Sequence, residues 1–270
     1  MSEGPTRITA IDLVPRLDEL PDVKLIGVGG VGCSLARYGA RYLASLDADS
    51  RLVLVDGDSF EASNATRMFF GSDGNKAEVV QQDLLPHLGN GRLTIEAIGE
   101  YVTPGNIEDL IRERDVVLLA VDNHATRKLV SDFCASRRED ICLISGGNDG
   151  VGKDSSGRER RGTAGNCQIY IRRGGADVTP SLTEFHAEIE TPLDRRPDEP
   201  DCINLLETTP QIGFANLTVA VSMLNTLWLY LCDVLHYPEL TFDIAEGLMR
   251  PIRLPLPAPA RGAGNPPSAA

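Results

Sequence analysis

Four glycines at close spacing are the first residues whose pattern predicts chemistry. They form a Gly-x-Gly-Gly-x-Gly turn and are Gly27, Gly29, Gly30 and Gly32. The turn is typical of a phosphate site, because glycines let the backbone approach an anion and the following helix directs unpaired N–H groups at it. Asp56, at the end of the next apolar run, is suited to ribose hydroxyls. These residues predict a nucleotide site without distinguishing NAD from ATP, and a glycine turn needed only for packing is the alternative.

A second set of polar residues follows along the chain and distinguishes between these two nucleotides. Taken singly, Arg67 and Arg127 could instead be surface ion-pair partners, and Lys76 could be a solvated helix residue. The set consists of Asp58, Asn64, Arg67, Lys76, Asp122, Asn123 and Arg127.

Four segments carry these residues in order along the first half of the chain. They read GVGGVG from Gly27, DGDSFEASNATR from Asp56, GNKA around Lys76 and DNHATR from Asp122. This order resembles the core of the ThiF/MoeB superfamily, which includes the activating enzymes for ubiquitin and ubiquitin-like proteins. In that family the core reads approximately GxGGxG, DxDxVxxSNLxRQ, GxxKA and DNxxxR. A nicotinamide dehydrogenase has no reason to carry the same set.

The resemblance implies an enzyme that uses ATP and Mg²⁺ to adenylate the C-terminal glycine of a ubiquitin-like or sulfur-carrier protein. Asp56 would hold the ribose, and Asp122 would hold the metal. Arg67 and Lys76 would act in catalysis at the phosphates. The residues implied to bind the nucleotide are Gly27, Gly29, Gly30, Gly32, Asp56, Asp58, Asn64, Arg67, Lys76, Asp122 and Asn123.

The chain departs from the family pattern in three ways. Ala65 and Met68 stand where SNLxRQ has leucine and glutamine, and the interval between Arg67 and Lys76 is shorter than usual. The paired Cys-x-x-Cys motifs of many members are absent, so no structural zinc is expected. A small chain of this type, without a zinc motif or an appended ubiquitin-fold domain, resembles small bacterial ThiF-like proteins.

Many family members pass the activated partner to a cysteine as a thioester or persulfide. Cys202 is the candidate for that thiol, because it follows an acidic loop and precedes an apolar helix. An inert loop thiol is the alternative. The other five cysteines fall inside expected helices and strands, where a small apolar role is usual. They are Cys33, Cys134, Cys142, Cys167 and Cys232.

The elements that must position these residues alternate regularly. Short apolar runs separated by helical segments predict an α/β fold with a Rossmann-like, doubly wound, mostly parallel sheet. The expected strands are Lys24–Val28, Arg51–Val55, Leu93–Ile98, Asp115–Val121 and Ile141–Ser145, and the expected helices are Cys33–Leu46, Lys76–Leu88, Asn106–Arg112 and His124–Ser136.

The second half of the chain is patterned more loosely. Residues 150–166 and 174–207 are rich in Gly, Pro and charge and are expected to be loops, the second being the crossover loop, with a strand at Cys167–Arg172 between them. A long apolar helix is expected at 208–236, followed by strands at Leu240–Ile244 and Ile252–Leu254. The predicted organisation is an N-terminal arm (1–20), one adenylation domain (21–250) and a disordered tail (255–270).

The apolar helix contains a charge-free stretch, Gln211–Cys232, that is long enough to span a membrane. Polar residues interrupt it, and no basic cluster flanks it, so a helix buried in a core or a dimer interface is the favoured interpretation. A homodimer is expected from the family resemblance, and this helix fits it. No membrane association is expected.

Composition limits the partners. The 270 residues include 26 basic and 39 acidic ones, which gives a formal charge of −13 and disfavours general nucleic-acid binding. A basic protein surface suits the charge better, and a conjugating enzyme is a further expected partner. With no secretion signal and unpaired cysteines, a reducing cytoplasm is the expected location.

Three other functions stay open at this point. The same enzyme class could activate a small molecule or a transfer RNA base, although the acidic charge argues against transfer RNA. A catalytically silent nucleotide-binding scaffold is the alternative from another class, and the presence of Arg67, Lys76 and Asp122 together argues against it. The last is an NAD oxidoreductase.

Overall fold

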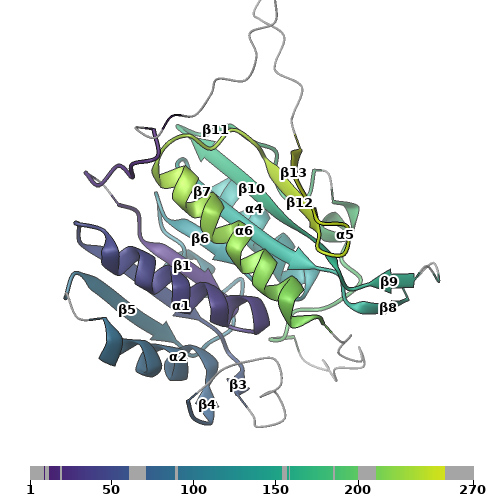
Figure 1. Cartoon of the computed structure of the whole chain (residues 1–270), viewed down its shortest axis with the longest axis horizontal. Coiled ribbons are helices and arrows are strands. Elements are labelled where there is room, and N and C mark those ends of the chain that lie inside the picture. Colours follow the sequence, from purple (N-terminus) through teal and green to yellow (C-terminus); the bar gives the residue numbers. More distant parts are fainter. Residues whose placement is uncertain are drawn as a thin grey trace, which may run out of the picture.

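A single large sheet organises the chain. The computed structural model describes residues 9, 12–18, 20–60, 71–88, 91–153, 157, 159–184, 186–199 and 211–252. The strand order is β13-β12-β10-β7-β6-β1-β2-β5, with β11 beside β10 (Figure 1). The strands are β1 (Val23–Ile26), β2 (Ser50–Val55), β5 (Leu93–Ile98), β6 (Val116–Leu119), β7 (Ile141–Asn148), β10 (Ala164–Arg173), β11 (Ala176–Asp177), β12 (Glu239–Asp243) and β13 (Leu248–Ile252).

The five strands β7-β6-β1-β2-β5 are parallel, and β10, β12 and β13 extend the sheet in antiparallel pairs. The chain leaves β1 for β2 and β5 on one side and returns to β6 on the other side, so the strand order reverses at β1. Ligands of open α/β sheets bind at the carboxyl ends of the strands where the order reverses. The predicted mostly parallel α/β fold is confirmed, and the reversal lies between the neighbouring strands β1 and β6.

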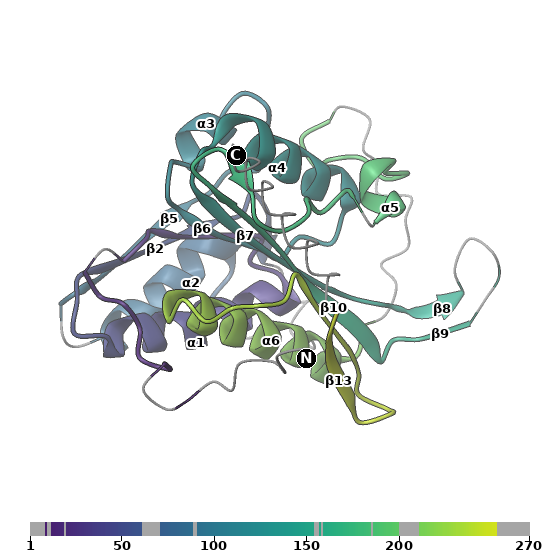
Figure 2. The same cartoon turned by 90° about the horizontal axis from the view of Figure 1, so that it is seen from above.

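Helices cover both faces of the sheet (Figure 2). One face carries α1 (Gly30–Ser45), α2 (Lys76–Leu84) and α6 (Gly213–Leu231). The other carries α3 (Ile107–Leu110), α4 (His124–Arg137) and α5 (Ala187–Glu190). A short 3-10 turn, Leu85–His87, continues α2. Because both faces are covered, the central strands read as continuous apolar runs, such as the fully buried Val116–Leu119 of β6.

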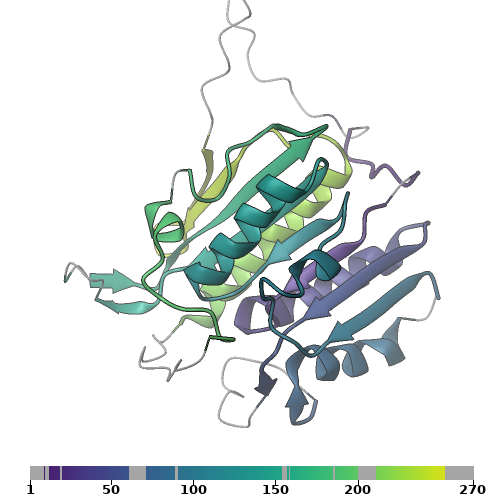
Figure 3. The same ribbon diagram turned by 180° about the vertical axis from the view of Figure 1, so that it is seen from behind.

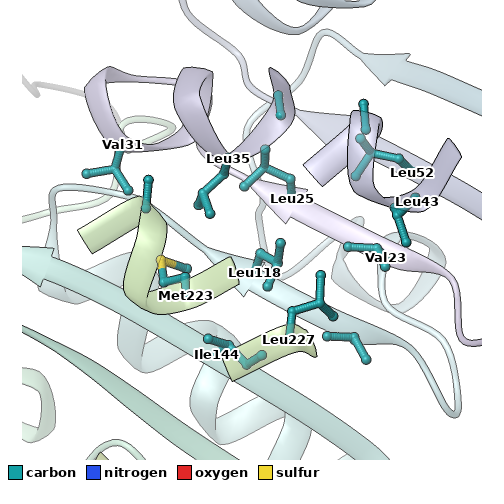
Figure 4. Packing of buried hydrophobic residues seen from close by; sticks show 14 of the residues in the cluster. Val23, Leu25, Val31, Leu35, Leu43, Leu52, Leu118, Ile144, Met223 and Leu227 are labelled. Atoms are coloured by element: carbon teal, nitrogen blue, oxygen red, sulfur yellow. The ribbon is translucent and has the colours of Figure 1, made fainter. Parts of the chain in front are cut away.

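The apolar core lies mainly between α1, α6 and the sheet. Figure 4 shows Leu35 of α1 and Met223 and Leu227 of α6 gathered over Leu25 of β1 and Leu118 of β6. All five of these side chains are at most 1% exposed. This packing holds the glycine turn after β1 against the rest of the sheet.

Helix α6 lies beside α1 and packs on β7 and β10. Two of the polar residues that interrupt its apolar sequence are satisfied within the helix, since Ser222 and Thr226 donate hydrogen bonds to the carbonyls of Thr218 and Ser222 at 2.8 and 2.9 Å. The buried Oδ1 of Asn216 has no hydrogen-bond partner among the described residues. The helix is long and apolar enough to cross a membrane, but half of its 18-residue apolar window is buried inside the protein. It therefore contributes to the core, as the sequence favoured; a dimer interface stays a prediction.

The two segments predicted as loops contain regular secondary structure. Residues 150–166 are not a plain loop, because β8 (Val151–Lys153) and β9 (Glu159–Arg161) form a hairpin beyond the end of β7, and β10 already begins at Ala164. The described part of 174–207 contains β11 and α5 and packs on α4, with Leu182 and Ile189 2% exposed.

Several predicted boundaries were also too long. The helix expected at Asn106–Arg112 is the four-residue α3, and the helix expected at 208–236 runs from Gly213 to Leu231 among the described residues. The strand expected at Asp115–Val121 covers only Val116–Leu119, because the chain turns away from the sheet before Asp122. The expected arm and tail lie largely outside the described residues.

Candidate functional site

The glycine turn lies at the point where the strand order reverses. Gly27 follows β1 with φ +88°, and a Cβ there would lie 2.9 Å from the backbone of Ala120 after β6. A Cβ on Gly32 would lie 1.9 Å from the carbonyl oxygen of Gly27. Both positions therefore require glycine, one for its left-handed backbone and both for close approach. The turn brings the start of α1 against the carboxyl end of β6.

The first turn of α1 is suited to an anion. Its N-cap, Gly29, provides no side-chain cap, and the first turn carries no acidic residue. The missing side chain of Gly30 leaves room for the buried amide of Asn216 from α6, whose Nδ2 would lie 2.6 Å from a Cβ there. The N–H groups of this turn and the positive end of the helix dipole are the features that bind phosphate.

Asp56, at the end of β2, is engaged by the main chain. Its carboxylate accepts hydrogen bonds from the N–H of Val28 at 2.5 Å and from the N–H of Asp58 at 2.8 Å. Burial raises the pKa of Asp56, although these bonds favour its charged form. Asp56 therefore fixes the glycine turn to the end of β2. Its predicted contact with ribose stays a prediction.

Asp58 and Lys76 form an ion pair next to Asp56. The Lys76 ammonium lies 2.7 Å from Asp58 Oδ2, and Tyr101 donates its hydroxyl hydrogen to Oδ1. Burial raises the pKa of Asp58, but the bonds from Lys76 and Tyr101 outweigh it and hold the pKa below its ordinary value. Lys76 is 8% exposed, so the interpretation of Lys76 as a solvated helix residue is wrong.

Local structure explains how these two residues meet. The short strands β3 (Ser59–Phe60) and β4 (Gly74–Asn75) pair and bring the start of α2 to the end of β2. Asn75 caps α2 by accepting from two backbone N–H groups of its first turn, and it donates to the carbonyl of Asp56 at 2.7 Å. Asn75 therefore positions Lys76 at the edge of the sheet formed by the carboxyl ends of the parallel strands.

Asp122 and Asn123 lie at the same edge, after β6. Asp122 is exposed, and among the residues that the structure describes no hydrogen bond or ion pair involves its carboxylate. Asn123 caps α4 by accepting from the N–H of Thr126 at 2.8 Å. Asp194, 70 residues further on, accepts from the next two N–H groups, those of His124 and Ala125, both at 2.8 Å.

Arg127 is buried behind these residues, not on the surface, so its interpretation as a surface ion-pair partner is wrong. Its guanidinium donates to the carbonyls of Val121 and Gly146 at 2.6 and 2.7 Å and to the hydroxyl of Ser145 at 2.5 Å. Burial lowers the pKa of Arg127 to about 10, so the group keeps its charge at neutral pH. It ties the carboxyl ends of β6 and β7 together.

The structure thus brings together the glycines, Asp56, Asp58, Lys76, Asp122 and Asn123 along one edge. Strands β2, β1 and β6 are neighbours at about 4.8 Å each, so the ends that carry Asp58 and Asp122 are roughly 10 Å apart. Asn64, Arg67 and Cys202 lie outside the described residues. Sequence reasoning missed Asn75, Tyr101, Asp194 and Asn216; only Asn75, directly before Lys76, had a local signal, that of a helix N-cap.

The five other cysteines are buried, as the sequence predicted. Burial raises the pKa of Cys134 and of Cys167 to about 12, so neither thiol forms a reactive thiolate at neutral pH.

The residues present fit a nucleotide-bound Mg²⁺ rather than an all-protein metal site. Among the described residues there is no group of three or more His, Cys, Asp or Glu side chains that could hold a metal ion. Mg²⁺ is commonly held by one or two carboxylates together with substrate phosphates and waters. The exposed carboxylate of Asp122, at the same edge of the sheet as the glycine turn, has that chemistry.

A glycine turn at the reversal point of a mostly parallel sheet defines the class of nucleotide-binding α/β proteins. Within that class, the chain belongs to the ThiF family, which matches residues 12–250.

Named relatives share part of the chain. Over 114 residues it is 37% identical to the adenylyltransferase and sulfurtransferase MOCS3 of Bos taurus, covering 42% of this chain and 24% of that protein. Over 112 residues it is 34% identical to the adenylyltransferase and sulfurtransferase uba4 of Emericella nidulans, covering 41% and 22%. The matched part is about a quarter of the length of these relatives.

Solved structures share the fold over most of the chain. Escherichia coli MccB in complex with MccA-N7isoASN superposes with a TM-score of 0.63 at 16% identity, covering 91% of this chain and 67% of MccB. PaaA superposes with a TM-score of 0.58 at 18% identity, covering 86% and 64%. At these identities the likeness shows the fold alone.

Proposed function

We propose that this protein adenylates the C-terminal glycine of a ubiquitin-like or sulfur-carrier protein, using ATP and Mg²⁺. The observation that carries the proposal is the convergence of the uncapped glycine turn, Lys76 and Asp122 at one edge of the sheet. Membership in the ThiF family and the match to two named adenylyltransferases support it. The structure of E. coli MccB with ATP superposes on this chain with a TM-score of 0.60 at 15% identity.

In the proposed reaction the carboxylate of the terminal glycine attacks the α-phosphorus of ATP. A C–O–P bond forms, the bond from the α-phosphorus to the bridging oxygen breaks, and pyrophosphate leaves with its electron pair. The N–H groups at the start of α1 and the Lys76 ammonium face the charge that builds on the phosphate oxygens, which lowers the barrier electrostatically.

The other residues hold the reacting groups in place. Asp56 fixes the glycine turn and would accept from a ribose hydroxyl, and Arg67 and Asn64 are proposed to reach the phosphates. Asp122 would hold Mg²⁺, which when bound neutralises phosphate charge.

The test is ATP–pyrophosphate exchange by the full chain. The probe is a small ubiquitin-fold protein that ends in Gly-Gly, and the control is the same protein without its last glycine. We expect exchange only with the intact partner. If ATP binds but no partner of this kind supports exchange, the protein is a silent scaffold or activates another substrate, and the proposal is wrong.

A thiol step is proposed after adenylation. The sulfur of Cys202 would attack the acyl-adenylate carbonyl, releasing AMP and forming a thioester. For Cys202→Ala we expect pyrophosphate exchange at the wild-type rate and loss of the thiol-sensitive adduct on a non-reducing gel. The matched control is Cys232→Ala, a buried cysteine at the end of α6, which should keep the adduct. An adduct that survives in Cys202→Ala would place the thiol elsewhere.

A further inference from the structure

The start of α4 is an unfavourable place for a cation. Its first turn carries about half a positive charge from the helix dipole. The buried guanidinium of Arg127, in the same turn, adds a full charge, and no carboxylate in the described part of the chain is hydrogen-bonded to it. Asp122 immediately precedes this turn. One carboxylate there leaves the region positive by about half a charge, which would repel a divalent ion.

Asp194 supplies a second carboxylate at this point. One of its oxygens accepts from the N–H of His124 and the other from the N–H of Ala125, which satisfies two donors that a helix otherwise leaves unpaired. Both Asp122 and Asp194 act electrostatically on Arg127, so the three charges form one local group. With two carboxylates the group becomes negative by about half a charge.

We propose that Asp194 is a positioning residue whose charge allows Asp122 to hold a divalent cation at the start of α4. Its negative charge offsets the positive charge of the helix N-terminus and of Arg127. Its hydrogen bonds also fix the first turn of α4, which follows Asp122 and Asn123. The inference rests on the proposed function, because it takes Asp122 as the metal ligand.

The fold holds Asp194 in place from a distant segment. This segment runs along α4 (Figure 3). The N–H of Leu182 donates to the hydroxyl of Ser131 at 3.3 Å, and the side chain of Ile189 is buried. His186 lies between Glu188 and Glu239, at 3.0 and 3.3 Å, which attaches the segment to β12. The carboxylate therefore reaches α4 from an anchored backbone.

The experiment measures Mn²⁺ binding to the full chain by electron paramagnetic resonance, in the presence of a non-hydrolysable ATP analogue. For Asp194→Asn we expect an affinity lowered about fivefold or more at low ionic strength. Binding of the analogue in EDTA should stay within about twofold of wild type, because the phosphate-binding turn is at α1. A purely structural role would change both measurements together.

The matched control is Asp198→Asn, which removes the same charge four residues away, where the carboxylate accepts from Arg196 at 3.0 Å. It should bind Mn²⁺ like wild type. Asp194→Glu keeps the charge and should recover most of the affinity. This second variant also covers the case in which Asp194→Asn folds poorly, which thermal unfolding would show.

Two failures can be told apart. If Asp122→Asn binds Mn²⁺ as wild type does, the metal assignment of the proposed function is wrong, and this inference falls with it. If Asp122→Asn loses affinity while Asp194→Asn matches Asp198→Asn, only the role of Asp194 is overturned. Faster amide hydrogen exchange at His124 and Ala125 in Asp194→Asn would support the contact itself.

Discussion

Asp122→Asn is expected to lower ATP–pyrophosphate exchange by about 100-fold or more, the loss typical of removing one group that stabilises transition-state charge. Asparagine keeps the size of the side chain but lacks the negative charge that Mg²⁺ prefers. Since the Asp122 carboxylate makes no hydrogen bond or ion pair among the described residues, the change should leave the fold intact. The measurement is exchange against Mg²⁺ concentration, with thermal unfolding alongside.

The control for this variant is Asp132→Asn on α4, the helix that follows Asp122. Asp132 is exposed and pairs with Lys128 at 3.1 Å, an i,i+4 surface ion pair that contributes little to stability. Exchange should stay at the wild-type rate in this control. Exchange by Asp122→Asn at wild-type rate and Mg²⁺ dependence would show that Asp122 is not the metal ligand.

The positions of the chemical residues were predictable because they follow strand ends. Asp56 and Asp58 come directly after one apolar run and Asp122 after another, and carboxyl ends of parallel strands meet at one edge. The glycine turn had its own local signal, confirmed by the left-handed φ of Gly27. Local sequence was sufficient for this part of the site.

The remaining contacts depend on tertiary packing. Tyr101 reaches Asp58 over a glycine, because a Cβ on Gly57 would lie 2.6 Å from its ring. Asp194 lies 70 residues from the helix that it caps, in a segment whose Pro and acidic residues indicated a loop. No periodicity or motif records such a pairing. The polar and glycine-rich 150–166 segment likewise forms a hairpin through backbone pairing between its two halves.

The helix starts at this edge differ in a way that bears on specificity. Helix α1 begins without a side-chain cap, whereas α2 is capped by Asn75 and α4 by Asn123 and Asp194. The N–H groups at α2 and α4 are therefore already satisfied by side chains of this chain. Under the proposed function, an incoming phosphate would find open donors at the glycine turn, so the nucleotide would lie beside β1 and Asp122 would approach its phosphates from the end of β6.

Arg127→Met is expected to destabilise the protein by about 3 kcal/mol or more. The change leaves the carbonyls of Val121 and Gly146 and the Ser145 hydroxyl without their buried donor, and each unsatisfied group costs roughly 1–3 kcal/mol. For a chain of this size that corresponds to a drop in Tm of roughly 6–12 °C. Thermal unfolding, checked by urea unfolding, measures it.

Two comparisons separate the buried network from a simple loss of charge. Arg127→Lys keeps the charge but cannot reproduce the planar fork that reaches three acceptors, so it should recover only part of the stability. Arg137→Met, at the exposed end of the same helix, should cost less than about 1 kcal/mol. If Arg127→Met unfolds at the wild-type temperature, the carbonyls must find other donors, and Arg127 does not hold β6 and β7 together. If the prediction holds, pyrophosphate exchange should fall further than the loss of folded protein explains, because Val121 directly precedes Asp122.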